Sequence, residues 1–156
     1  MEFGTYKGDF LNLLAKLQPQ RHFYGFDSFI GLPESWTMGC RKGAFTTKGR
    51  LPKVRKNVSL IAGFFDKTLP DFIKEHAGQQ VAMIHNDSDL YSSTITIFEE
   101  LRKMIVPGTI ICFDEYYNYS EWQEGKYKAF MEITEKYCGW FSSYSGIFRA
   151  FSRGQI

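Results

Sequence analysis

The sequence predicts an α/β fold built on an open, mostly parallel sheet. Four short apolar or β-branched runs recur along the chain, at 22–26, 58–62, 81–85 and 109–113. Segments with helical spacing lie before and between these runs, and such alternation is typical of βαβ units. A chain of 156 residues with 44% hydrophobic content is sufficient for one core, so residues 1–156 are expected to form a single domain.

Helical spacing is clearest in 91–105. Ser92 or Ser93 is expected to cap the start of this helix, and Pro107-Gly108 is expected to stop it. Apolar residues recur on one face, as expected of a helix that packs on a sheet. They are Tyr91, Ile95, Phe98, Leu101 and Ile105.

Three more helices and a terminal hairpin are predicted with less regular patterns. Residues 9–18 form an amphipathic segment with Asp9 as its candidate cap, and 69–76 and 121–137 are the other two helices. The tail 139–156 alternates weakly and predicts a hairpin. Between the first two apolar runs, 31–56 is rich in Gly, Pro and Lys and predicts a long surface loop, typical of lids, binding loops or disorder.

Composition excludes several classes of function. Nineteen basic and seventeen acidic residues give a net charge of +2 without a basic cluster, so no nucleic-acid partner is expected. No apolar run approaches the roughly 20 residues of a membrane span. Three scattered cysteines favour neither a disulfide framework nor a paired zinc site. These features predict a soluble chain in a reducing, cytoplasmic setting.

Carboxylates follow three of the four predicted strands. Asp27 follows the first run, Asp87 and Asp89 follow the third, and Asp114 with Glu115 follows the fourth. Ligands of open α/β sheets bind beyond the carboxyl ends of the strands, so these side chains should converge at one edge. Converging carboxylates require an offsetting cation, proton or ligand hydroxyl, and Mg²⁺ or Ca²⁺ would suit them.

A glycine turn opens the chain. Gly4 and Gly8 bound a G-x-x-x-G turn that enters the 9–18 helix, where backbone can approach a ligand closely. Asp27 follows Gly8 at close to the ~20 residues that separate a glycine loop from the ribose-binding carboxylate in nucleotide sites. An adenosine-containing ligand is therefore indicated. The G-x-G-x-x-G motif is absent, which weakens a nicotinamide or flavin interpretation.

Each feature also has a structural interpretation. Asp87 and Asp89 can form an Asx turn, and Asp27 can be a solvated turn residue. The glycines can simply permit a tight turn. Phe64 can border an adenine or pack in the core. The aromatics after the last carboxylates can form a platform for a sugar or pack on the sheet; they are Tyr116, Tyr117, Tyr119 and Trp122.

Four motifs in order resemble the macrocin O-methyltransferase family of class I methyltransferases. They are EFGTYKG (2–8), YGFDSFIGLPESW (24–36), HNDSDLYSST (85–94) and VPGTIICFDEYYNYSEWQEGKYKAF (106–130). The resemblance implies a Rossmann-like fold with helices on both faces of the sheet. It also implies a methyltransferase domain that transfers a methyl group from S-adenosylmethionine to a hydroxyl of a sugar or glycosylated metabolite. The expected partner is this small-molecule acceptor, and a homo-oligomer stays open.

The resemblance also implies site residues. Asp87, Asp114 and Glu115 would hold Mg²⁺, and Asp87 and Asp89 would be catalytic, with Asp89 as the candidate proton acceptor. The metal would bind a substrate hydroxyl and lower its pKa. The expected contacts of the cofactor are Gly4, Thr5, Gly8, Asp27, Ser28, Gly63 and Phe64.

The chain departs from the family in three places. The family has N-terminal helices and an apolar strand before EFG, so this chain is expected to be N-terminally truncated, with its first strand largely missing. Asn86 stands where relatives carry an apolar residue, and Glu115 replaces a common Asp. Two alternatives follow: a metal-dependent transferase or hydrolase that does not use S-adenosylmethionine, and a catalytically impaired remnant that acts as an interaction module.

Overall fold

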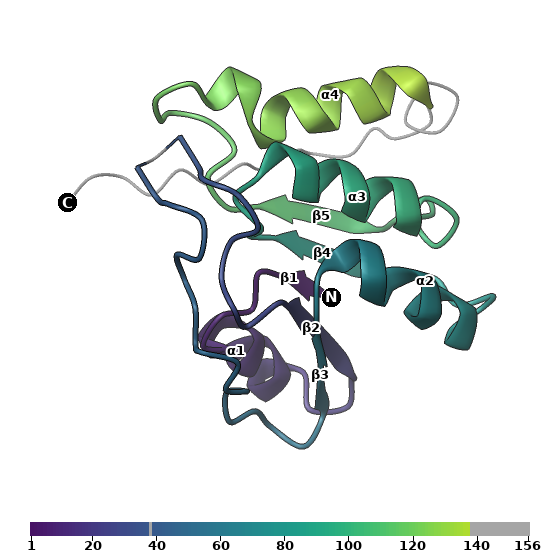
Figure 1. Cartoon of the computed structure of the whole chain (residues 1–156). Coiled ribbons are helices and arrows are strands. Elements are labelled where there is room, and N and C mark those ends of the chain that lie inside the picture. The colour runs from purple at the N-terminus through teal and green to yellow at the C-terminus, as the bar shows by residue number, and fades with distance from the viewer. Residues whose placement is uncertain (38, 138–156) are drawn as a thin grey trace.

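The computed structural model describes residues 1–37 and 39–137, which form one five-stranded sheet with helices on both faces (Figure 1). The strand order is β3-β2-β1-β4-β5, and all four neighbouring pairs are parallel. The predicted α/β architecture is therefore confirmed. The strands are β1 (Glu2–Phe3), β2 (Phe23–Asp27), β3 (Val58–Ala62), β4 (Met83–Asn86) and β5 (Ile110–Phe113).

The central strand β1 contains only two residues. Glu2 pairs with Gly25 on one side and with His85 on the other, and Phe3 continues both ladders. The amino group of Met1 donates a hydrogen bond to the carbonyl oxygen of Met83 at 2.8 Å. Burial lowers the pKa of this amino group to about 6, since the charged form loses hydration. The sequence predicts a first strand that is largely missing, and β1 is shorter than the other four strands of the sheet.

Helix α1 (Asp9–Leu17) covers one face of the sheet, where Leu11 and Ala15 pack against Val58. The prediction that Asp9 caps this helix is wrong. Gly8, with a φ of 75°, is the N-cap residue, and no side chain of the described residues caps the helix. Asp9 instead occupies the first turn, where its charge is favourable at the positive end of the helix dipole.

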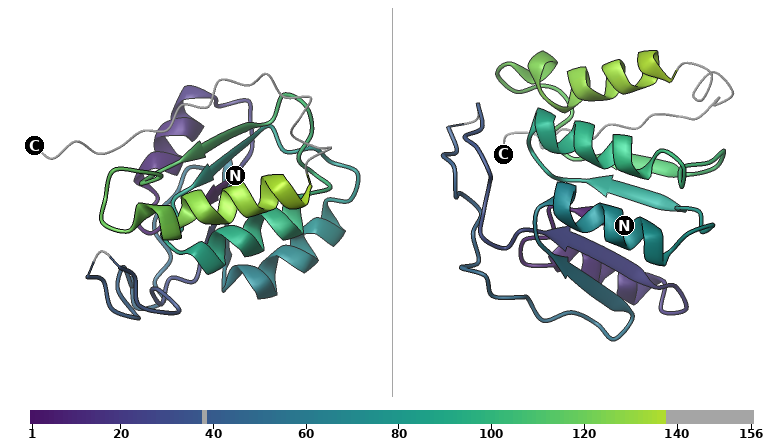
Figure 2. Two further views of the ribbon diagram at one scale, coloured as in Figure 1. Left: turned by 90° about the horizontal axis from the view of Figure 1, so that it is seen from above. Right: turned by 45° about the vertical axis from the view of Figure 1, so that its right-hand side comes forward.

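Helices α2 (Phe65–Glu75), α3 (Tyr91–Leu101) and α4 (Lys126–Lys136) lie side by side on the opposite face (Figure 2). The main core lies beneath them, and it includes Phe3 and Phe26, whose rings stack at 4.8 Å. Alternate residues of a strand point to opposite faces, so Phe26 enters this core while Gly25 faces α1.

Three helix boundaries differ from the predictions. Helix α2 begins one turn before the expected residue 69, because Phe65 packs edge-on against Phe3 and makes that extra turn part of the core. Helix α3 begins after Leu90 without a cap from Ser92 or Ser93, and it ends at Leu101 rather than residue 105. Before α4, the chain forms a short 3₁₀ helix (Trp122–Glu124), so the predicted 121–137 helix is split.

The long segment between β2 and β3 has no helix or strand in its described residues, but it is hydrogen-bonded throughout. Leu32 and Ala44 pair through their backbones, and the amides of Thr47 and Gly49 both donate to the carbonyl oxygen of Phe29. Asn57 closes the segment by donating to carbonyl oxygens of α1 and its following turn. The loop prediction is therefore confirmed. The predicted hairpin at 139–156 lies outside the described residues.

Among the described helices, none combines the length and apolar character that a membrane crossing requires.

Candidate active site

A cavity of about 370 Å³ lies at the carboxyl edge of the sheet. Its walls come from the loops that follow β1, β2, β3 and β4, with the first turns of α2 and α3 closing one side. This is the edge at which open parallel sheets bind ligands. Seven of the predicted site residues line it: Gly4, Asp27, Ser28, Gly63, Phe64, Asp87 and Asp89.

Gly4 lies where the β1 loop meets the β4 loop. Its φ is 88°, and a Cβ built on it would lie 2.0 Å from the carbonyl oxygen of Asp87. No side chain fits at that distance, so glycine is required both by conformation and by close approach. The turn predicted from sequence thus brings the first loop against the catalytic candidate Asp87.

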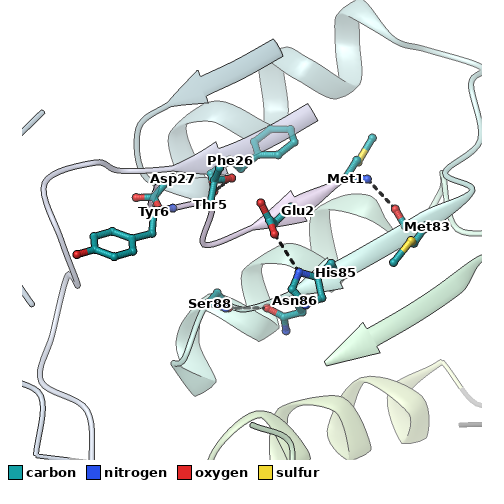
Figure 3. A network of polar contacts seen from close by, with 10 residues as sticks. All are labelled: Met1, Glu2, Thr5, Tyr6, Phe26, Asp27, Met83, His85, Asn86 and Ser88. Carbon is teal, nitrogen blue, oxygen red and sulfur yellow. Dashed lines mark hydrogen bonds and ion pairs between the residues drawn. The ribbon is translucent and has the colours of Figure 1, made fainter. Parts of the chain in front are cut away.

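Asp27 ends β2 and accepts hydrogen bonds from two backbone amides, and Figure 3 shows it beside one of the two donors, Tyr6. Its Oδ2 accepts a hydrogen bond from the Tyr6 amide and its Oδ1 accepts one from the Phe29 amide, both at 2.7 Å. Burial raises the pKa of this carboxyl, and the two amide hydrogen bonds act in the opposite direction. Each carboxylate oxygen has a second lone pair, so a ligand hydroxyl can still be accepted. Asp27 therefore organises the loops and faces the cavity.

The other predicted cofactor contacts fall into two groups. Ser28, Gly63 and Phe64 line the cavity, and the amide of Gly63 donates to the carbonyl oxygen of Asp27 at 2.9 Å. Thr5 and Gly8 are absent from its walls. The side chain of Thr5 is buried near the Phe26 carbonyl, and Gly8 begins α1. Direct contact of these two residues with a cofactor stays a prediction.

The carboxylates after β4 and β5 converge as expected. Asp87, Asp114 and Glu115 each offer an oxygen atom within 4.8 Å of the others, and all three side chains are partly buried. An all-carboxylate set suits a hard divalent cation such as Mg²⁺. These residues fit the predicted metal centre, while their role as ligands stays a prediction.

Two of the carboxyls have strongly raised pKa values. Burial, reinforced by neighbouring Asp114, raises the pKa of Asp87 to about 8. Burial also raises the pKa of Asp89 to about 7, with the ammonium of Lys126 acting against it. Strongly shifted carboxyls in a cleft mark a candidate functional site.

The backbone is also unusual at this edge. Asp89 and Glu115 both adopt left-handed conformations, with φ values of 63° and 45°. Residues other than glycine rarely adopt this region, and such residues cluster at functional sites. The turns after β4 and β5 therefore hold their carboxylates in place at some cost in backbone energy.

Sequence reasoning missed Lys126, the first residue of α4. Its side chain is fully buried, and its Nζ lies 3.9 Å from Asp89 Oδ1 and 3.8 Å from Glu115 Oε2. A lysine that begins a helix ordinarily lies in solvent, so the local sequence carries no signal for this position.

In the sequence Asn86 stands out only as a departure from relatives, whereas the structure gives it a set of hydrogen bonds, of which Figure 3 shows those with Ser88. This buried residue donates from Nδ2 to the hydroxyl of Thr94 in α3 at 3.0 Å. Its Oδ1 accepts hydrogen bonds from the amide and the hydroxyl of Ser88. Asn86 thus ties the 87–89 turn to α3. A polar residue at the end of a strand, within a carboxylate motif, is the signal that could have identified it.

The aromatic residues after β5 do not form one platform. Tyr116 packs against the core next to Phe113, so the packing interpretation holds for it. Tyr119 instead lies edge-on to Trp36 of the long loop, with ring centroids 5.9 Å apart. Its hydroxyl is buried and has no hydrogen-bond partner among the described residues. Trp36 and Tyr119 therefore join the loop to the segment that carries Glu115.

Solved structures of methyltransferases are similar to this chain. The calicheamicin methyltransferase CalS11 is 26% identical with a TM-score of 0.74, over 85% of this chain and 62% of that one. An apo structure of CalS11, named as a TDP-rhamnose 3'-O-methyltransferase, is 24% identical with a TM-score of 0.63, over 85% and 61%. The O-methyltransferase NovP is 20% identical with a TM-score of 0.60, over 88% and 63%.

The last two similarities show the fold alone, and the chain spans about three fifths of the length of all three structures. No curated protein matches the chain. A family model described as a methyltransferase domain matches residues 1–116, which include Gly4, Asp27, Asp87 and Asp114. The chain therefore belongs to the methyltransferase domain family.

Proposed function

We propose that this chain is an S-adenosylmethionine-dependent O-methyltransferase, assisted by Mg²⁺, that acts on a hydroxyl of a sugar or glycosylated metabolite. One observation carries the proposal. Asp27 and Asp87 face the same cavity, and Asp87 also belongs to the cluster of carboxylates that suits a divalent cation. The candidate ribose-binding carboxylate and the candidate metal ligands are thus close enough to serve one reaction.

Different residues would bind the cofactor and the metal ion in the proposed site. Asp27 would accept ribose hydroxyls, and Gly4 and Gly63 would let the backbone approach the cofactor closely. Asp87, Asp114 and Glu115 would hold Mg²⁺. When bound, S-adenosylmethionine supplies the electrophilic methyl group, and Mg²⁺ lowers the pKa of a coordinated hydroxyl.

Asp89 would accept the proton of the acceptor hydroxyl. A carboxyl with a pKa of about 7 is suited to take up a proton near neutral pH. Bound S-adenosylmethionine would supply the methyl group to the acceptor oxygen and would leave as S-adenosylhomocysteine, with the electron pair of the broken carbon–sulfur bond on sulfur. Asp89 would take up the proton of the hydroxyl, which balances the reaction.

The identity of the acceptor, a sugar or glycosylated metabolite, is the most specific part of the proposal. The similarity to CalS11, which is named as a TDP-rhamnose methyltransferase, supports it. Assignment to the macrocin O-methyltransferase family within the methyltransferases belongs to the same proposal.

Calorimetric titration with S-adenosylhomocysteine, with and without Mg²⁺, tests the cofactor. Asp27→Asn keeps an acceptor for one backbone amide but removes the negative charge, and we expect a loss of at least tenfold in affinity, about 1.4 kcal/mol. Asp71→Asn is the matched control, since Asp71 is an exposed residue of α2 that does not line the cavity. A folded wild-type chain that binds no S-adenosylhomocysteine would contradict the proposed function.

A further inference from the structure

Lys126 is the one fully buried cation among the residues that the structure describes. Its ammonium donates a hydrogen bond to the carbonyl oxygen of Asp114 at 2.8 Å. Taking an ammonium out of water is costly unless opposite charges surround it. The position of Lys126 therefore needs a cause, and the acidic cluster provides it.

Two carboxylates flank this ammonium at longer range. Asp89 Oδ1 lies at 3.9 Å and Glu115 Oε2 at 3.8 Å, beyond hydrogen-bond distance but close enough for strong attraction in a buried site. These carboxylates belong to different loops, one after β4 and one after β5, while the lysine comes from α4. A single ammonium thus links three elements at the edge of the sheet.

The ammonium offsets part of a concentrated negative charge. Four carboxylates lie in this cluster, those of Asp87, Asp89, Asp114 and Glu115, and their mutual repulsion contributes to the raised pKa values of Asp87 and Asp89. The charge of Lys126 opposes both shifts. Asp114 and Glu115 also belong to the set of three that could hold a metal ion. A metal ion and the ammonium would therefore be attracted to the same carboxylates.

We propose that Lys126 is a tethered counter-cation that shares the carboxylates of the candidate metal centre with the divalent ion and weakens the binding of that ion. This inference rests on the metal site of the proposed function. Because the ammonium offsets their repulsion, the four carboxylates of the cluster stay together when no metal ion is bound. Lys126 is a positioning residue in this account, because it acts through Asp89 and Glu115.

Calorimetric titration of the full chain with MgCl₂, after treatment with EDTA and dialysis, tests this inference. Lys126→Met removes the charge and retains most of the side-chain volume. We expect this variant to bind Mg²⁺ about tenfold more tightly than wild type, because a nearby positive charge no longer competes for the carboxylates. Lys128→Met is the matched control on the same helix, since Lys128 is half exposed and pairs with Glu124; its Mg²⁺ affinity should equal that of wild type.

Thermal unfolding with and without Mg²⁺ gives a second readout. Lys126→Met should lower the melting temperature more in EDTA than in excess Mg²⁺. If this variant unfolds in EDTA, recovery of its circular dichroism on Mg²⁺ addition reports binding coupled to folding, and the affinity is then measured on Lys126→Gln. Lys126→Gln, which can still donate to the Asp114 carbonyl, provides a second neutral variant.

Equal or weaker Mg²⁺ binding by both neutral variants would overturn the inference, as would no binding by any form. Binding by the variants but not by wild type would support it and would count against Mg²⁺ assistance in the unmodified chain. S-adenosylhomocysteine binding measured on the same samples shows separately whether the methyltransferase proposal stands.

Discussion

Gly4 shows at the scale of one residue how the site depends on contact between two loops. Gly4→Ala should destabilise the fold by at least ~3 kcal/mol, because a methyl group would clash with the Asp87 carbonyl in addition to the strain of a positive φ. Gly78→Ala is the matched control. Gly78 has a φ of 82°, and no atom of the described residues lies within 4 Å of a built Cβ, so Gly78→Ala should cost only ~1 kcal/mol. Urea unfolding of both variants measures the difference, and equal losses would contradict the described contact.

Glu2 is a buried carboxyl with an incomplete set of partners. Its Oε1 contacts His85 Nδ1 at 3.1 Å, whereas its Oε2 has no hydrogen-bond partner among the described residues (Figure 3). Burial raises the pKa of Glu2 above its ordinary value of 4.5, and the contact with His85 acts in the opposite direction. The folded state therefore binds more protons than the unfolded state above pH 4.5, so Glu2 destabilises the fold increasingly as pH rises from there.

Glu2→Gln should remove this pH dependence. Below pH 4 the free energies of unfolding of variant and wild type should be close, because the carboxyl is then protonated in both states. Toward pH 8 the free energy of unfolding of the variant should rise relative to that of wild type, as measured by urea unfolding in EDTA. Glu75→Gln, at the exposed end of α2, provides the same change in formal charge. A free energy of unfolding that falls relative to wild type toward pH 8 would contradict the described burial of Glu2.

At the scale of elements, local patterns predicted the strands better than the helix ends. The runs at 58–62 and 109–113 match β3 and β5 within one residue, because a strand in a parallel sheet is apolar along its whole length. The predicted start of α2 at residue 69 is one turn late, because the contact of Phe65 with Phe3 sets the boundary instead. Contacts between distant residues carry no local sequence signal.

The turn after β4 shows the same limit within the candidate site. Asp87 and Asp89 could be identified from their position after a strand, as could Asp27. Lys126 could not, since its burial depends on carboxylates 11 or more positions away in sequence. Asn86 looked like a departure from relatives, and only its contacts with α3 and Ser88 give it a role.

Asn86→Leu should therefore affect both α3 and the 87–89 turn. Loss of its buried hydrogen bonds should cost ~2–4 kcal/mol in the free energy of unfolding, and Mg²⁺ affinity should fall several-fold as Asp87 loses its fixed position. Thr94→Val removes only the contact with α3, so it should cost ~1 kcal/mol and leave Mg²⁺ affinity near that of wild type. Unchanged Mg²⁺ affinity in folded Asn86→Leu would argue against a positioning role for Asn86.

At the scale of the whole molecule, the site joins two halves of the sheet around the short strand β1. Asp27 and Gly63 follow β2 and β3 on one side, whereas Asp114 and Glu115 follow β5 on the other. The order of strands cannot be derived from the individual strand patterns, and it is this order that sets Asp87 between the two groups. A cofactor and a metal ion would thus contact different halves that meet at β1 and β4.

This arrangement predicts that each ligand stabilises the fold through its own residues. At 100 times its dissociation constant, a ligand that binds only the folded state adds ~2.7 kcal/mol to the free energy of unfolding. Asp27→Asn should lose at least about half of the gain from S-adenosylhomocysteine, as a tenfold weaker affinity implies, and keep the gain from Mg²⁺, because Asp27 is outside the group of metal-capable carboxylates. Asp114→Asn should show the reverse, because Asp114 belongs to that group but does not line the cavity. Urea unfolding of both variants, with and without each ligand, gives the four ligand-dependent gains in the free energy of unfolding. Loss of both gains in either folded variant would mean that the two halves act as one binding unit, and the separation of cofactor and metal residues would then be wrong.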